Sequence, residues 1–173
     1  MTQTARQVAP GRFRESFGRY YEDFTVGDVY EHRPGRTITQ ADNTWFTLLT
    51  MNTHPLHFDE EYARSSEFGR CIVASPLTVA LVVGMSVSDV SQQAIANLGW
   101  REIRMTAPLF PGDTLYAESA VLEKRESRSR PGAGIVTVHS RGLNQDGVEV
   151  CNFERTILVA RRGHGVGEDR GGN

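Results

Sequence analysis

The strongest constraint on the fold lies in the second half of the sequence, where short runs of alternating apolar and polar residues follow one another. Alternation of this kind is typical of strands that bury one face. The breaks between runs carry turn residues, including Pro111-Gly112-Asp113 and the hairpin signal Asp146-Gly147. The runs cover residues 103–107, 115–121, 135–140 and 148–159. Because consecutive strands joined by tight turns pair antiparallel, this half of the chain predicts an antiparallel sheet.

A long apolar helix is expected just before these strands. Ser75 is a strong N-cap candidate, and Pro76 fits the first helical position, where its missing N–H is tolerated. We therefore expect a helix over Ser75–Gln92. Residues spaced by three or four would form the face that packs on the sheet. That face contains Leu77, Ala80, Leu81, Gly84, Val87, Val90 and Ala94.

Shorter elements are expected earlier in the chain. An extended piece near Val29–His32 should end at the turn signal Pro34-Gly35. Thr39 is a candidate N-cap for a first helix, with Asp42 three residues later in the capping-box position, and a short second helix should cover residues 60–66. Helices followed by consecutive strands predict an α+β fold with helices on one face of an antiparallel sheet.

Composition favours an ordinary folded domain and excludes several classes of function. The chain has 173 residues, of which 39% are hydrophobic and 23% charged, and its formal net charge is −2. The length suits one domain, and the lack of excess positive charge argues against a nucleic-acid partner. No apolar run could cross a bilayer and no secretory signal is visible, so we expect a cytoplasmic protein with no membrane partner.

The ends of the chain differ from its body. We expect residues 1–19 to form a flexible N-terminal extension, residues 20–161 the folded domain, and residues 162–173 a flexible Gly-rich tail. Cys71 and Cys151 are too few for a disulfide framework and indicate two reduced thiols.

Polar side chains cluster in the break after the first helix, where Asn52, His54 and His57 lie within six residues beside Pro55. They could form a polar loop in which His57 bonds a backbone carbonyl, or an acid/base site, because imidazole titrates near neutrality. The helix start at Ser75 presents N–H groups that would suit a developing oxyanion, although it could also be only a capped helix. The histidines and cysteines lack the spacing of a metal site, so no metal is expected.

Several motifs spread over the body of the chain occur in a recognisable order. They are Thr37-Ile38-Thr39-Gln40-Ala41-Asp42, Asn52-Thr53-His54-Pro55-Leu56-His57-Phe58-Asp59, Phe68-Gly69-Arg70 and Pro108-Leu109-Phe110-Pro111-Gly112-Asp113-Thr114-Leu115. Together they resemble the MaoC-like (R)-specific enoyl-CoA hydratases, which have the hotdog fold. Three further segments look more like the branch that acts on mesaconyl-CoA or itaconyl-CoA. They are Asn52-Thr53, Ser86-Val87-Ser88-Asp89 and Ser127-Arg128-Ser129-Arg130-Pro131-Gly132.

The resemblance implies a single hotdog domain, an antiparallel sheet wrapped around one long central helix. Such domains usually pair into a homodimer, or a higher homo-oligomer, with the acyl-CoA in a tunnel at the interface. The implied enzyme adds water reversibly to a 2-enoyl-CoA thioester, in which CoA is part of the substrate and no separate cofactor is needed. The chemistry requires an acid/base near neutrality and a donor to the thioester oxygen as it takes on enolate charge.

Carried over to this sequence, the resemblance assigns proton transfer to His57 and water positioning to Asn52. The donor to the thioester oxygen would be the N–H of Ser75, with Leu77 as a second candidate. Most family members have Asp in place of Asn52, Asn in place of His54, and His-Gly-Met where this chain has Ala74-Ser75-Pro76. Because an amide cannot take up and return a proton, His57 must carry that step. His54 could contribute, although a structural role in the loop is expected for it.

Binding residues follow less directly. Arg128 and Arg130 could meet the CoA phosphates or belong to a solvated loop, and Pro55 is assigned to substrate binding from its place in the motif. A free carboxylate on the substrate would need a cation, for which Arg70 and Arg101 are both available. Aromatic residues near the motif are expected in the core rather than in an acyl pocket. They are Trp45, Phe46 and Phe58. The alternative functions are a non-catalytic acyl-CoA-binding hotdog protein and a hotdog thioesterase.

Overall fold

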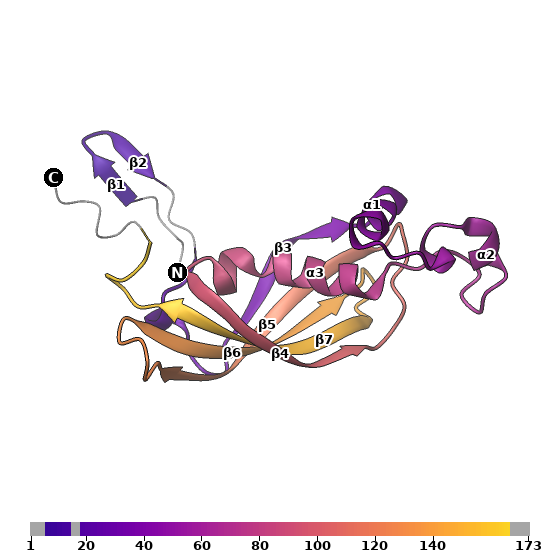
Figure 1. The fold of residues 1–173 in the computed structure, drawn as a ribbon. Coiled ribbons are helices and arrows are strands. Elements are labelled where there is room, and N and C mark those ends of the chain that lie inside the picture. Colours follow the sequence, from indigo (N-terminus) through magenta and orange to yellow (C-terminus); the bar gives the residue numbers. More distant parts are fainter. Residues whose placement is uncertain (1–5, 15–17, 167–173) are drawn as a thin grey trace.

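The computed structural model describes residues 6–14 and 18–166, and its main feature is an antiparallel sheet curved around a helix (Figure 1). Five strands form the sheet, and each pairs antiparallel with its neighbours. Their order across the sheet is β3 (Val29–Thr37), β5 (Thr114–Glu126), β6 (Ala133–Leu143), β7 (Glu149–Ala160) and β4 (Ala94–Met105). The predicted α+β class and antiparallel sheet are confirmed.

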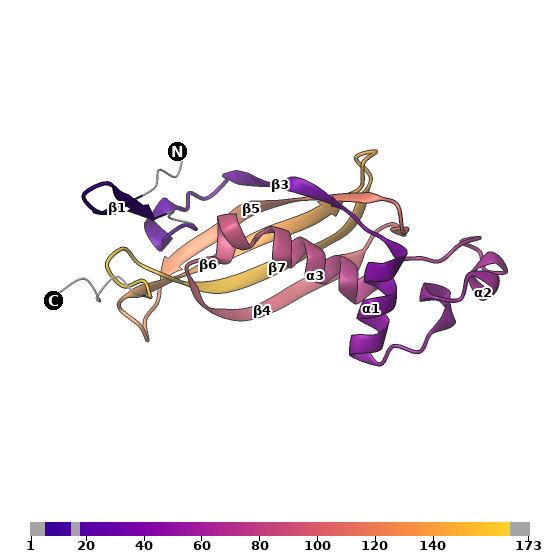
Figure 2. The same ribbon diagram turned by 90° about the horizontal axis from the view of Figure 1, so that it is seen from above.

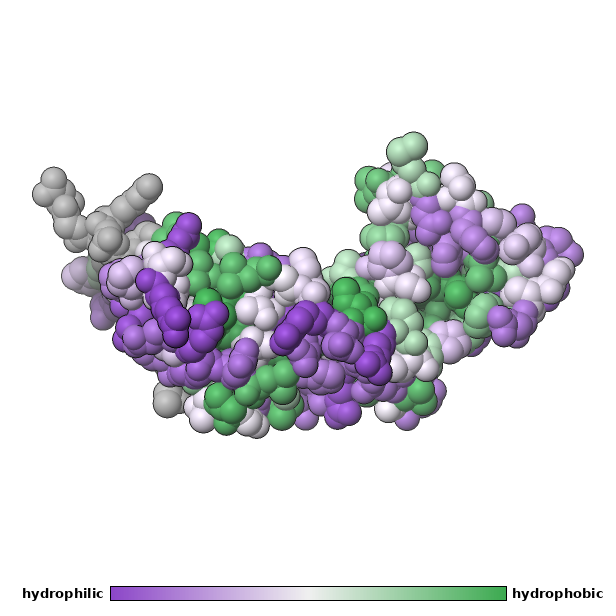
Figure 3. All heavy atoms as spheres, turned by 60° about the horizontal axis from the view of Figure 1, so that its bottom comes forward, coloured by the Kyte–Doolittle hydropathy of each residue, from purple (hydrophilic) through white to green (hydrophobic). Residues whose placement is uncertain are grey.

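Three α-helices accompany the sheet within the described residues. They are α1 (Gln40–Thr50), α2 (Glu60–Arg64) and α3 (Ser75–Met85). Seen from above, α3 lies across the concave face of the sheet, whereas α1 and α2 lie beyond one end of it (Figure 2). The space-filling view shows α1 and α2 as a lobe that protrudes from the body (Figure 3). The face of the body visible in that view is hydrophilic with several hydrophobic patches. Short helical turns fill connections at Tyr21–Asp23 (η1), Pro55–His57 (η2) and Val87–Ser91 (η3).

A short hairpin precedes the main sheet. Its strands, β1 (Arg6–Ala9) and β2 (Arg12–Arg14), form a separate two-stranded sheet inside the segment predicted to be a flexible extension. The rest of the predicted terminal segments lies partly outside the described residues, namely at 1–5, 15–17 and 167–173. The three domain boundaries therefore stay predictions.

The central helix differs from its prediction in both its ends and its buried face. Ala74 is the N-cap and Ser75 the first helical residue, so the predicted capping role of Ser75 is wrong. The helix ends at Met85 and passes into the π-turn η3, while Ala94 already belongs to β4. Leu77 is buried as predicted. The other buried positions of α3 are Thr78 and Val82, whereas Ala80 and Gly84 are exposed.

Strand β3 also differs from expectation, because it continues through Pro34-Gly35 instead of ending there. Its pairing with β5 is irregular between His32 and Arg36, which accommodates a proline that cannot donate to the ladder on this edge strand. Gly35 is needed for close approach, since a Cβ there would lie 2.4 Å from the ring of Tyr116.

The core lies between α3 and the sheet and consists of two buried clusters. One surrounds the first half of α3, and the other lies at the η1 end of the sheet. Phe46 packs against the first cluster, but Trp45 is 66% exposed and Phe58 43% exposed, so their predicted core positions are wrong. No helix in the described part of the chain is long and apolar enough to span a membrane.

Candidate active site

Helix α1 positions the polar loop that follows it through one buried amide. Thr39 caps the helix and forms the predicted capping box with Asp42. The side-chain Nδ2 of Asn43 donates to the carbonyls of His57 (2.8 Å) and Ile72 (2.9 Å), and its Oδ1 accepts from the N–H of Ala74 (2.9 Å). One fully buried side chain therefore holds the polar loop against the segment that leads into α3.

His57 ends the turn η2 and is half-buried. Its Nδ1 lies 3.0 Å from the carbonyl oxygen of Ile72. Because a carbonyl only accepts, Nδ1 carries the proton, and in the neutral ring the lone pair is on Nε2. Nε2 has no hydrogen-bond partner among the described residues, so this nitrogen is available as a base.

Asn52 and His54 are fixed within the same loop. Oδ1 of Asn52 accepts from the N–H of His54 (3.1 Å), which leaves its side-chain N–H groups as donors. His54 is exposed, and its Nδ1 accepts from the N–H of Leu56 (3.2 Å) as the N-cap of η2. The geometry thus gives His54 a structural part in shaping the turn that presents His57.

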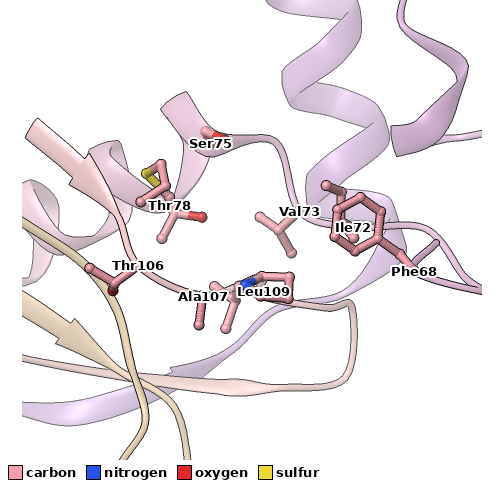
Figure 4. A pocket seen from close by; sticks show the side chains of 10 residues that line it. Phe68, Ile72, Val73, Ser75, Thr78, Thr106, Ala107 and Leu109 are labelled. Carbon is pink, nitrogen blue, oxygen red and sulfur yellow. The ribbon is translucent and has the colours of Figure 1, made fainter. Parts of the chain in front are cut away.

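A hollow of about 310 Å³ opens at the start of α3 (Figure 4). Its walls come from the segment 68–73, from Ser75 and Thr78 on α3, and from residues 105–109 at the end of β4. Ile72, whose carbonyl bonds the imidazole of His57, is one of the lining residues, whereas His57 itself is not. The predicted base is therefore linked to the hollow through the backbone of Ile72 but does not line it.

The helix start supplies one free backbone donor to the hollow. The N–H of Ser75 has no recorded acceptor in the described residues, and the positive end of the helix dipole lies there. The N–H of Leu77, the second predicted donor, is bonded to the carbonyl of Ala74 at 2.9 Å and is not available. Ser75 is therefore the donor that this arrangement leaves for a thioester oxygen.

Thr78 also faces the hollow and was not predicted as a functional residue. It is 1% exposed, and its Oγ1 is the one fully buried side-chain nitrogen or oxygen without a partner in the described chain. Figure 4 shows this hydroxyl turned toward the middle of the hollow. In the sequence, only its place three residues after Ser75, the predicted donor, pointed to a functional role for Thr78. The sequence pointed more strongly to Asn43, because Asn43 and Thr47 are polar residues four positions apart on one face of the first helix.

The structure separates the predicted binding residues. Pro55 begins η2 beside His57, and the guanidinium of Arg70 stacks on the ring of Phe110 at 3.8 Å from its centroid. Arg128 and Arg130 lie in the loop after β5, at the far end of a strand that begins next to α1. Twelve residue steps along β5 span about 40 Å, so one chain does not bring this loop to its own His57.

Neither cysteine resembles a nucleophile. Both are free and buried, as expected for reduced thiols. Burial raises the pKa of Cys71, and Glu60 and Asp59 raise it further, while burial raises the pKa of Cys151 to about 11. Within the described ranges, no three His, Cys, Asp or Glu side chains gather to hold a metal ion.

Comparison with known proteins gives relatives for nearly the whole chain. The family model for mesaconyl-CoA hydratase matches residues 5–173. A mesaconyl-CoA hydratase of Cereibacter sphaeroides is 37% identical over 84% of this chain and 42% of its own length. A beta-methylmalyl-CoA dehydratase of Chloroflexus aurantiacus is 36% identical over 84% of this chain and 41% of its own. The chain thus spans about two fifths of the length of these relatives.

Solved structures show the same architecture. A putative MaoC domain dehydratase from Chloroflexus aurantiacus superposes with a TM-score of 0.80 at 36% identity, covering 84% of this chain and 41% of the other. A MaoC-like dehydratase from Rhodospirillum rubrum gives 0.74 at 33% identity, over 84% and 99%. A Mycobacterium tuberculosis protein with a double hotdog fold gives 0.75 at 23% identity, over 83% and 44%. The predicted hotdog fold is confirmed.

Proposed function

We propose that this chain, which belongs to the mesaconyl-CoA hydratase family of MaoC-like hotdog proteins, adds water reversibly to a 2-enoyl-CoA thioester. The observation that carries the proposal is that Nδ1 of His57 is bonded to Ile72, a residue lining the hollow that begins at Ser75, while Nε2 has no partner among the described residues. The relatives named for mesaconyl-CoA hydration and beta-methylmalyl-CoA dehydration support a short branched dicarboxylyl-CoA as the substrate. The site of action is the cytoplasm, where two reduced thiols are expected.

The proposed reaction gives a role to His57, Asn52 and Ser75. Nε2 of His57 takes a proton from water as the water oxygen bonds to C3, and the electrons of the double bond move toward the thioester oxygen. The N–H of Ser75 donates to that oxygen as it becomes an enolate. The proton held on Nε2 of His57 then passes to C2, which returns the imidazole to its neutral form. Asn52 contributes an N–H donor that positions the water, because its Oδ1 is already bonded to the N–H of His54.

The working unit is proposed to be a homodimer joined through β4. This strand forms an edge of the sheet, and five apolar side chains on it are 42% to 52% exposed. They are Ile95, Leu98, Trp100, Ile103 and Met105. A long, unprotected apolar edge is an aggregation hazard unless another chain covers it, and a second β4 would extend the sheet across the interface. In such a dimer the loop of Arg128 and Arg130 would serve the CoA phosphates of the partner's site rather than of its own.

A turnover assay tests the proposed function. The purified chain is incubated with mesaconyl-CoA and, separately, with the linear crotonyl-CoA. We expect loss of enoyl-thioester absorbance without release of free thiol. Thiol release would show a thioesterase instead, and binding without any turnover would show an acyl-CoA-binding protein.

The base is tested with His57→Asn, whose amide can still donate to Ile72 in the place of Nδ1 but offers nothing in the place of Nε2. We expect kcat to fall by about 100-fold or more with both substrates, alongside a similar loss in His57→Ala. The matched control is His54→Asn, which keeps an acceptor for the N–H of Leu56 and retains activity. Full activity in His57→Asn would contradict the mechanism. The dimer is tested by measuring the molar mass with light scattering. We expect the wild type to be dimeric and Trp100→Lys to be monomeric.

A further inference from the structure

Arg155 on β7 is a buried cation without a counter-charge. It is 6% exposed and lies on the face of the sheet that α3 covers. Its Nε donates to Oδ1 of Asn97 at 2.7 Å and its Nη1 to Oγ of Ser86 at 3.2 Å, and both acceptors are neutral. No carboxylate of the described residues lies within 4.0 Å of it, whereas Arg19 and Arg101 each pair with one.

This arrangement calls for an anion from outside the chain. Burial lowers the pKa of Arg155, but a guanidinium stays protonated in proteins, so the charge remains. A buried charge is unfavourable unless an opposite charge and hydrogen bonds compensate it. Two neutral oxygens satisfy only two of the five N–H groups. The planar fork that remains is suited to a carboxylate.

The hollow beside Ser75 lacks a positive charge for the substrate, whereas Arg155 lacks a negative one. Its lining includes no cation, although the proposed substrate carries a free carboxylate, and the hydroxyl of Thr78 has no partner. Thr78 lies one turn beyond Ser75, a rise of about 4.5 Å, which is the span of a four-carbon chain from its thioester carbonyl to its far end. Thr78 is therefore placed to meet the distal end of the acyl group.

Arg155 cannot reach the hollow of its own chain. It contacts Ser86, which is eleven residues after Ser75, or about 16 Å along a helix. A pairing of two β4 strands about a two-fold axis changes this. If the axis passes near Trp100, the middle of the exposed row, residues 95–97 of one copy lie opposite residues 103–105 of the other. The Asn97–Arg155 region then faces the hollow that Met105 lines in the partner.

We propose that Arg155 of each subunit binds the free carboxylate of a dicarboxylyl-CoA held in the hollow of the partner subunit, with the hydroxyl of Thr78 donating a second bond to that carboxylate. The inference rests on the proposed function and on the dimer, and it names the residue that selects dicarboxylyl over linear substrates. Each active site is then composite, with its base from one subunit and its selecting cation from the other.

Selectivity is the first test. The measured quantity is the ratio of kcat/KM for mesaconyl-CoA to that for crotonyl-CoA. We expect this ratio to fall at least about tenfold in Arg155→Met, since a hydrogen-bonded charge pair is lost. The matched control is Arg141→Met, because Arg141 is half-exposed on β6 and already paired with Glu118. An unchanged ratio in folded Arg155→Met would overturn the proposal, whereas His57→Asn lowers both values and reports on the hydratase mechanism separately.

A second variant keeps the test decisive if Arg155→Met does not fold. Asn97→Asp is nearly isosteric and places a carboxylate 2.7 Å from Nε of Arg155, where it competes with the substrate's carboxylate. We expect the same ratio to fall, chiefly through a higher KM for mesaconyl-CoA. A ratio equal to that of the wild type would again overturn the proposal.

The composite site is tested by complementation. His57→Asn and Arg155→Met chains are co-expressed with different affinity tags, and mixed dimers are isolated through both. If Arg155 acts on the partner's site, each mixed dimer has one intact site and about half of the wild-type activity on mesaconyl-CoA. If it acts within its own chain, no site is intact and the mixed dimer is no more active than its parents. The latter result would overturn the assignment to the partner.

Discussion

Thr78 offers a test in which removing a polar group is expected to stabilise the protein. Its Oγ1 is buried on α3 without a partner, and leaving a buried hydroxyl unsatisfied costs about 1–3 kcal/mol. Thr78→Val keeps the shape and the β-branch while removing the hydroxyl. We therefore expect the free energy of unfolding to rise by about 1 kcal/mol.

Thr47 provides the matched control, because it is also a buried helical threonine, 3% exposed, but its Oγ1 donates to the carbonyl of Thr44 at 2.8 Å. Thr47→Val loses a made hydrogen bond, so we expect about 1 kcal/mol of destabilisation. The two variants should thus move the melting temperature in opposite directions, each by about 2–4 °C for a domain of this size.

The assay is thermal unfolding at a fixed protein concentration, because the melting temperature of the proposed dimer would depend on concentration. It is repeated with a saturating dicarboxylyl-CoA, which we expect to stabilise the wild type more than Thr78→Val. If Thr78→Val loses as much stability as Thr47→Val, the hydroxyl has a partner in solution and the reasoning is refuted.

Three further outcomes follow from the site and its surroundings. Asn52→Asp keeps an acceptor for the N–H of His54, and we expect it to remain a hydratase but to shift preference toward linear enoyl-CoA in the turnover assay; an unchanged rate and preference would place Asn52 away from the water. Asn43→Ala leaves two carbonyls and one N–H unpaired, and we expect calorimetry to show a loss on the order of 3 kcal/mol, together with weaker turnover. His32 is fully buried between Asp89 and Ser119, and burial lowers its pKa despite the favourable bond to Asp89. Since the unfolded chain takes up this proton and the folded chain resists it, stability should fall below about pH 6.5 by up to 1.4 kcal/mol per pH unit, a slope that His32→Gln removes from the melting curves.

Features set by local chemistry were predictable from the sequence. The cap of α1 depends only on Thr39 and Asp42, which bond each other across three residues, and the hairpin at Gly147 depends on a positive φ of 75°. The long strands likewise follow from a local pattern, the alternation of apolar and polar residues. In each case the interactions that fix the structure lie close together in the sequence, so tertiary contacts had little to override.

Features that depend on tertiary context were not predictable in the same way. Nearly every residue of α3 is apolar, so periodicity could not tell which side faces the sheet, and the predicted face included the exposed Ala80. Trp45 was expected in the core because large apolar residues usually lie there, yet α1 turns its polar Asn43 inward to hold the polar loop of His57. At the site, the motif located His57, but only coordinates could show which nitrogen is bonded.

The residues that sequence reasoning missed share a property that indicates whether one chain or a dimer forms the complete site. Thr78 and Arg155 are buried polar groups whose bonding is incomplete in the single chain, and the apolar edge β4 is uncovered between the regions that hold them. A folded domain seldom has, at the same time, a buried donor without an acceptor, a buried charge without a counter-charge and an apolar edge strand exposed to solvent. The proposed two-fold pairing would account for all of them, since it would cover β4 and bring the cation of one copy to the hollow of the other. If the proposed dimer forms, substrate selection depends on both subunits, whereas the placement of the base depends on one chain alone.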